Sequence, residues 1–98
     1  MARYDIHASD DGYHYVDVQA DGLSHLNTRV VIPLMTLDVA PVPGKRLNPI
    51  FDIGGAPRSL VTQYLGTARL STLGPVVGSL AGEQDRISAA IDMVLHGF

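Results

Sequence analysis

The sequence contains no cysteine among its 98 residues. Disulfide bonds and thiol chemistry are therefore excluded, which suits a reducing compartment. No apolar run approaches the roughly 20 residues that a membrane-spanning helix needs, and residues 1–5 show no signal peptide pattern. Seven Lys and Arg stand against ten Asp and Glu, and this net charge of −3 argues against a surface built for phosphate backbones. We expect a cytoplasmic protein with no membrane contact and no direct nucleic-acid binding.

Recognisable catalytic and metal-binding motifs are also missing. The four histidines, His7, His14, His25 and His96, do not have the spacing of metal ligands. Ser, His and Asp are present, but no nucleophile elbow or glycine-rich motif frames them. The cations are scattered along the chain, which gives little sign of the basic groove of a ribonuclease. We expect no metal, no cofactor and no enzymatic activity.

The composition is that of a single globular domain over residues 1–98. Hydrophobic residues make up 46% of the chain and charged residues 17%, so disorder is not indicated. No internal repeat or domain boundary is visible. A chain of this length has a modest core, and dimerisation would help it.

Alternating apolar and polar residues predict three strands in the first third of the chain, over residues 4–8, 15–19 and 29–34. We expect Ile6, Val16 and Ile32 to face the core, and His7, Asp17 and Gln19 to lie on the opposite faces. A turn at residues 10–12 and a break at 21–22 would connect the strands as an antiparallel meander. Pro33 cannot donate to a β-ladder, so the third strand is expected to end there or to lie at a sheet edge.

The middle of the chain is less regular. Prolines and glycines predict a surface loop over residues 35–49, with a possible short strand near 36–39. Residues 50–53 and 57–65 are expected to form two strands joined through Gly54-Gly55. Residues 70–80 are ambiguous, and Gly74-Pro75 could open a helical turn. About five strands and one final helix predict a small, mostly β, α+β domain in which the helix covers an antiparallel sheet or partial barrel.

The last sixteen residues predict a helix over 83–98 that runs to the final residues of the sequence. Its apolar residues follow the spacing of a single helical stripe, at Ile87, Ala90, Ile91, Val94, Leu95 and Phe98. His96 lies in the last turn, and Gly97 supplies a left-handed stop. Asp92 is four residues before His96, so a local ion pair is available. Phe98 is then either part of the core or exposed for a partner.

Several segments resemble the CcdB family of bacterial toxins. The resemblance is carried by residues 15–19, by Asp21 and 29–34, by 47–50, by Ile53-Gly54 and by Ile87…Ala90-Ile91 before a penultimate glycine. It covers essentially the whole chain and is faint at 35–46 and 66–80.

The resemblance implies a small SH3-like antiparallel barrel of the CcdB/MazF type, with a C-terminal α-helix, assembled as a homodimer. Family members are toxins of toxin–antitoxin modules that bind the A subunit of DNA gyrase and trap it on cleaved DNA, and a cognate CcdA-like antitoxin neutralises them. The family's gyrase contacts, carried onto this sequence, are Gly22, Leu23, Asp92, His96, Gly97 and Phe98.

This sequence departs from the family at those contacts. His96 occupies a tryptophan position, Phe98 an isoleucine, Asp92 an asparagine and Gly22 an isoleucine. An imidazole can still stack on an arginine of gyrase, but with less area than an indole. We therefore keep two alternatives open: an interaction protein of this fold that no longer poisons gyrase, and an RNA-cleaving toxin of the MazF type.

Two partner surfaces are predicted beyond the helix tip. Lys45 and Arg46 form the only basic pair and are expected to contact an acidic, partly disordered antitoxin. The helix flank around Met93 leaves apolar surface that a second copy of the chain would cover.

Overall fold

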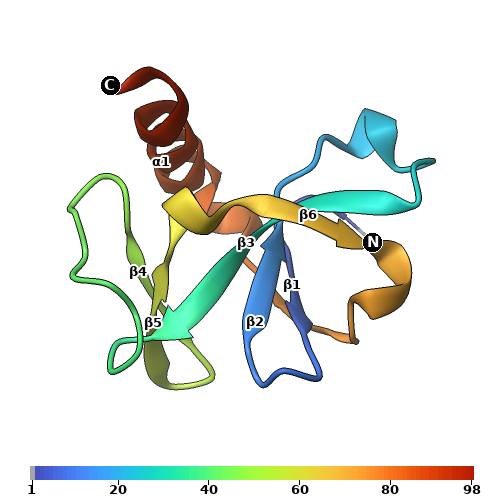
Figure 1. The fold of residues 1–98 in the computed structure, drawn as a ribbon, viewed down its shortest axis with the longest axis horizontal. Coiled ribbons are helices and arrows are strands. Elements are labelled where there is room, and N and C mark those ends of the chain that lie inside the picture. The colour runs from blue at the N-terminus through green and yellow to red at the C-terminus, as the bar shows by residue number, and fades with distance from the viewer. Residues whose placement is uncertain (1) are drawn as a thin grey trace.

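The computed structural model describes residues 2–98 and contains, in that range, one curled antiparallel sheet of seven strands and one α-helix (Figure 1). The strands are β1 (Asp5–Ala8), β2 (His14–Asp17), β3 (Thr28–Thr36), β4 (Ile50–Ile53), β5 (Ala56–Leu60), β6 (Gly66–Arg69) and β7 (Val76–Ser79). Helix α1 spans Gln84–His96. Short 3₁₀ turns lie at η1 (Asp21–Leu23), η2 (Thr62–Tyr64), η3 (Leu70–Thr72) and η4 (Ala81–Glu83). The expected mostly β, partial-barrel fold with a C-terminal helix is confirmed.

The predicted meander of β1, β2 and β3 is present and forms the centre of the sheet. Ile6 lies opposite Val16, and Val16 lies opposite Ile32, so three branched side chains form one buried row across the strands. The strand order β4-β5-β3-β2-β1-β7 places β3 inside the sheet, with β6 also pairing with β3. Ile87 and Ala90 of α1 belong to the same buried cluster as this row.

Pro33 lies in the interior of the longest strand, so its expected place at an edge or strand end is wrong. It pairs with Tyr15 of β2 on one side. On its other side β3 changes partners, from β6 up to Val31 to β5 from Leu34 onward. The Pro33 carbonyl accepts a hydrogen bond from Val61 there. The missing N–H therefore falls in the gap between two partner strands, where no ladder bond is lost.

Three polar residues that were predicted to lie opposite the core, His7, Asp17 and Gln19, are buried, so that prediction is corrected. Arg29 is buried as well. The segment before β7 folds over this side of the sheet, where the Gly74 N–H donates to the Ala8 carbonyl and the Gly74 carbonyl lies 3.0 Å from Nδ1 of His7. Alternation in the sequence shows which residues share a face, but a face also becomes buried when a later segment covers it.

Asp17 forms the centre of this buried polar group. One carboxylate oxygen accepts the Gln19 N–H at 3.0 Å, and the other lies 3.7 Å from Nε of Arg29. Burial raises the pKa of Asp17, because the loss of water outweighs the stabilisation of the carboxylate by Gln19 and Arg29. The pair therefore fixes side-chain positions more than it contributes net stability.

From residue 37 onward the structure differs from the sequence expectations in four places. The β4–β5 hairpin is confirmed, with positive φ at Gly54 and Gly55. Residues 37–40 form a turn and not a strand, and residues 62–64 form η2 and not the end of a strand. Strand β6 was not predicted. Gly74-Pro75 leads into β7 and does not open a helical turn.

Gly74 gives the first testable prediction. A Cβ at this position would overlap the backbone carbonyl of Ala8, so Gly74→Ala must displace either β1 or the segment before β7. Overpacking of this kind costs about 1–3 kcal/mol, and the free energy of unfolding from urea denaturation should fall by that amount. Gly82→Ala is the matched control, because nothing lies within 4 Å of its Cβ position. Equal stability of the two variants would contradict the close approach.

Candidate functional site

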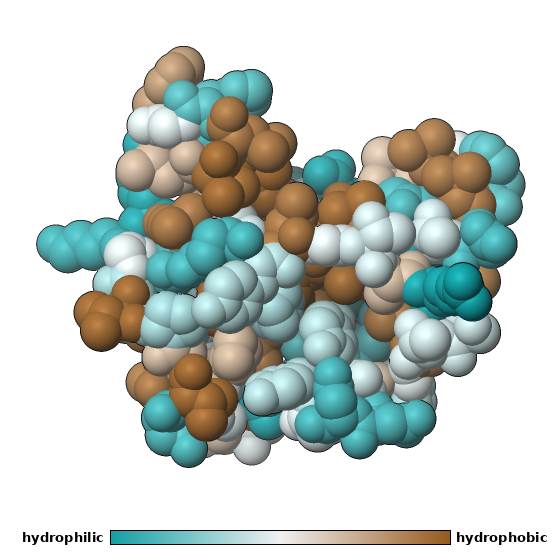
Figure 2. Space-filling view, viewed as in Figure 1, coloured by the Kyte–Doolittle hydropathy of each residue, from teal (hydrophilic) through white to brown (hydrophobic). Residues whose placement is uncertain are grey.

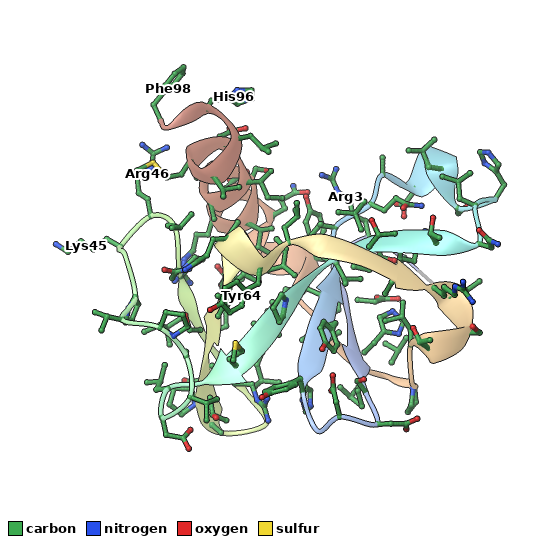
Figure 3. All side chains as sticks on the ribbon, in the orientation of Figure 1. Arg3, Lys45, Arg46, Tyr64, His96 and Phe98 are labelled. Carbon is green, nitrogen blue, oxygen red and sulfur yellow. The ribbon has the colours of Figure 1, made fainter. Side chains whose placement is uncertain are left out.

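The tip of α1 projects away from the sheet and carries two aromatic rings (Figures 1 and 3). Gly97 ends the helix at φ 80°, and its N–H donates to the Met93 carbonyl at 2.9 Å. Phe98 follows with 77% of its surface exposed. The rings of His96 and Phe98 are 6.3 Å apart between centroids and tilted by 40°. Phe98 is therefore outside the core of the chain, and the two rings form one exposed aromatic pair.

Asp92 lies one turn before His96 on the solvent side of α1. Among residues 2–98 the ion pairs are Arg29–Asp17 and Arg86–Glu83, so the predicted local pair between Asp92 and His96 is not formed. Asp92 is exposed. Its carboxylate remains accessible beside the aromatic pair.

An apolar groove of about 470 Å³ separates α1 from the loop at η1. Leu23 of η1 and Leu95 of α1 line opposite parts of it, together with Leu26 and Ile91. Figure 2 shows the hollow, with hydrophobic surface along its walls. Leu23 is 47% exposed and Leu95 62%. The fold thus brings the η1 loop and the flank of the helix tip, which are more than 70 residues apart in sequence, to the two sides of one groove.

Leu95 was not predicted as a site residue. The sequence placed it on the apolar stripe of the helix, which suggests a core position. In the structure the core contacts of α1 are made by Ile87 and Ala90, with Ile91 partly buried against them, and Leu95 faces the groove instead. The signal that could have identified it is its position on the margin of the stripe, immediately before His96.

A buried glutamine holds the η1 loop in place. The Gln19 side chain donates from Nε2 to the Leu23 carbonyl at 3.0 Å, and its Oε1 accepts the Val30 N–H at 3.2 Å. Arg3 adds a second attachment, since its backbone N–H donates to the Asp21 carboxylate at 2.9 Å. Gln19 therefore connects β3 to the loop that carries Gly22 and Leu23. The sequence pattern had placed Gln19 on a polar face and gave no sign of this role.

Lys45 and Arg46 lie on the other flank of α1, in the loop between β3 and β4 (Figure 3). Both are exposed. The structure therefore does not bring them together with Gly22 and Leu23, and α1 stands between the two groups. The predicted site residues form one cluster at the tip and groove and a second, basic cluster on the opposite flank.

Two kinds of feature, a membrane-spanning helix and a metal-binding cluster, are absent from residues 2–98. No helix there is long and apolar enough to cross a membrane, and no three His, Cys, Asp or Glu side chains are grouped so that they could hold a metal ion.

Gln19 gives the second prediction. Gln19→Met keeps the side-chain volume but leaves the Leu23 carbonyl and the Val30 N–H without their partner, which costs about 1–3 kcal/mol. Amide hydrogen exchange should accelerate most over residues 21–26, because the loop loses its attachment. The control is Gln84→Met, at an exposed position, where exchange should stay as in the parent. Unchanged protection of residues 21–26 in Gln19→Met would show that the loop is held by other contacts.

Comparison with known proteins gives one family and a group of structures. The family model described as CcdB protein matches residues 3–97. The Mycobacterium tuberculosis toxin MazF-mt6 has a TM-score of 0.77 at 20% identity, covering 92% of this chain and 94% of that one. An endoribonuclease in complex with its cognate antitoxin, from a mycobacterial species, has a TM-score of 0.78 at 15% identity, covering 97% and 94%. At these identities the structures show a shared fold. A comparison with curated protein sequences gave no significant match.

Proposed function

The chain belongs to the CcdB family, a family of toxins from toxin–antitoxin modules, and on that premise we propose that it binds the A subunit of DNA gyrase and traps the enzyme on cleaved DNA. Such a target would place its action in the cytoplasm. A cognate CcdA-like antitoxin would neutralise it.

The observation that carries this proposal is the exposed aromatic tip. Phe98 leaves 77% of its surface in water. Burial of an aromatic side chain lowers the free energy, so this exposed ring would stabilise a complex in which a partner covers it. Gly97 ends the helix with its N–H bonded to the Met93 carbonyl, so the chain turns away from the helix axis just before Phe98. Buried aromatic anchors are the usual hot spots of protein interfaces. The tip therefore has the properties of a contact surface and lies where the family places its gyrase contact.

The departures from the family pattern are compatible with this role at the tip. The family ends in Trp-Gly-Ile and this chain in His96-Gly97-Phe98, so the larger ring has moved from the first of these positions to the last. Both rings lie in one cluster. An arginine of the target could stack on either ring, and the exposed Asp92 carboxylate would attract its guanidinium.

The alternative of an RNA-cleaving toxin receives less support from the side chains. A hollow of about 310 Å³ on the sheet is lined by Tyr15, Tyr64 and Asp11, among others. The Asp11 carboxylate there would repel a phosphate backbone. Burial and the hydrogen bond to Asp11 raise the pKa of Tyr15 to about 12, so its hydroxyl stays protonated at neutral pH and is a poor general base. We propose a toxin that acts by binding, without enzymatic activity.

The third prediction concerns the tip. Deletion of Gly97-Phe98, or His96→Ala, should abolish gyrase-dependent DNA linearisation by the purified protein, while the midpoint of thermal unfolding changes little. His96→Trp adds aromatic area and should retain or strengthen linearisation. Val77→Thr removes apolar surface at another exposed position and serves as the control.

The outcomes separate the alternatives. If the truncated protein linearises DNA as well as the parent does, the tip is not the contact. If the parent protein does not linearise DNA but binds an antitoxin encoded beside it, the chain is an interaction protein of this fold. Cleavage of RNA by the purified protein would support the MazF-type alternative.

We also propose that the protein is a symmetric homodimer. The sequence pointed to the helix flank around Met93 as the surface that a second copy would cover. In the structure Leu26 and Leu95, which line the groove, are more exposed than Met93. A second copy would cover part of it.

The fourth prediction tests this assembly. Light scattering at micromolar concentration should give about twice the chain mass, and Leu26→Glu should shift the protein toward the monomer. Leu37→Glu, at an exposed leucine in another loop, should leave the mass unchanged. A monomeric parent protein would contradict the proposed dimer.

A further inference from the structure

A small basic pocket lies on the flank of α1 that faces away from η1. Its volume is about 150 Å³, and it is lined by Lys45, Arg46, Pro49, Arg86 and Ala89. Three of the seven Lys and Arg of the chain thus line one pocket on a protein of net charge −3, although the Lys45 side chain points outward from the loop (Figure 3). The sequence showed only the Lys45-Arg46 pair, because Arg86 joins it through the packing of α1 against the loop.

Arg86 is held in place before any ligand binds. Its guanidinium lies 4.5 Å from the centroid of the Phe51 ring, and Phe51 is buried. One terminal nitrogen donates to the Ile50 carbonyl at 3.3 Å, and the other lies 3.3 Å from the Glu83 carboxylate. A guanidinium carries five N–H donors, so these two bonds leave donors for a further acceptor. The contact with Glu83 is half exposed and neutralises Arg86 only weakly.

Lys45 and Arg46 have no charge partner within residues 2–98, yet the loop that carries them is fixed. The amide of the buried Asn48 accepts the Gly44 N–H at 3.0 Å and donates to the Leu60 carbonyl at 3.1 Å. The Asn48 N–H also donates to the Gly44 carbonyl at 2.8 Å. Asn48 thus ties both ends of the segment bearing the basic pair to β5, so the backbone of this segment is held in place before any ligand binds.

We infer that this pocket binds a side-chain carboxylate of an acidic peptide segment. The volume of the pocket suits one carboxylate group. A guanidinium donates charge-assisted hydrogen bonds to a carboxylate, and neighbouring cations add to the attraction. The negative net charge of the protein disfavours a nucleic acid as the occupant. The inference rests on the proposed function in one respect, namely that the segment belongs to the antitoxin.

The pocket also has a place relative to the helix tip. Arg86, Ala89, Met93 and His96 lie at i, i+3, i+7 and i+10, so they share one face of α1. A peptide anchored by a carboxylate at Arg86 could continue along this face to the aromatic pair. The antitoxin would then cover the tip from the basic flank, which is separate from the apolar groove.

The fifth prediction is a titration of the full chain, labelled with ¹⁵N, with a short synthetic peptide of alternating Glu and Leu. The Arg86 Nε–H and the Ala89 amide should shift with this peptide and not with its Gln-for-Glu counterpart. Arg86→Gln should weaken binding about tenfold, since a charge-assisted hydrogen bond is lost. Arg69→Gln removes the same charge at an exposed site on β6 and should leave affinity within about twofold of the parent's, because screened distant charges contribute little.

A second variant does not depend on the anchoring contacts of Arg86. Ala89→Glu introduces a carboxylate into the lining of the pocket. This carboxylate should occupy the cations and repel the peptide, so peptide binding should be lost. Ala89→Gln, with equal size and no charge, should retain more of it. Thermal unfolding of each variant shows that it is folded; should Arg86→Gln unfold, the Ala89 pair decides.

Three results would contradict carboxylate binding at the pocket. The first is amide shifts of equal size with the Glu and Gln peptides, and the second is equal weakening of peptide affinity by Arg69→Gln and Arg86→Gln. The third is equal loss of peptide binding in Ala89→Glu and Ala89→Gln. The titration contains no gyrase, so it can fail while DNA linearisation persists, and the pocket alone would then be wrong. Conversely, loss of linearisation with an intact titration would overturn gyrase poisoning and leave the carboxylate site in place.

Discussion

The burial of Ile87 and Ala90 against the row formed by Ile6, Val16 and Ile32 determines the rest of the functional surface. Ile87 and Ala90 are fully buried and lie three residues apart, so they fix the rotation of α1 about its axis. Once this face is buried, the other faces of α1 lie beside the η1 loop, beside the loop between β3 and β4, or in solvent.

Those faces separate three kinds of surface. Leu95 borders the apolar groove shared with η1, and Arg86 and Ala89 border the basic pocket beside the loop between β3 and β4. Asp92 and His96 remain in solvent. A single helix therefore divides two chemically different surfaces, the apolar groove and the basic pocket, on a chain of this size.

Both loops beside α1 are attached to the sheet through one buried amide side chain each. Gln19 connects η1 to β3, and Asn48 connects the basic loop to β5. An amide suits this task because it donates and accepts at once and carries no charge to desolvate. The toxin MazF-mt6 and the mycobacterial endoribonuclease share the fold at 15–20% identity. A fold alone does not define a function, so loops such as these and the helix tip are where differences in function would arise.

The sequence by itself determined the local features of this protein. The 3.6-residue stripe gave α1 with its Gly97 stop, period-two alternation gave the β1–β2–β3 meander, and Gly54-Gly55 gave the hairpin, because each depends only on neighbouring residues. Tertiary structure decided what no local pattern encodes. Pro33 is tolerated inside β3 because two other strands meet beside it, and His7 is buried because a distant segment lies against it. Leu95 and Arg86 acquired their surroundings in the same way, since a groove or a pocket exists only where segments far apart in the chain come to lie side by side.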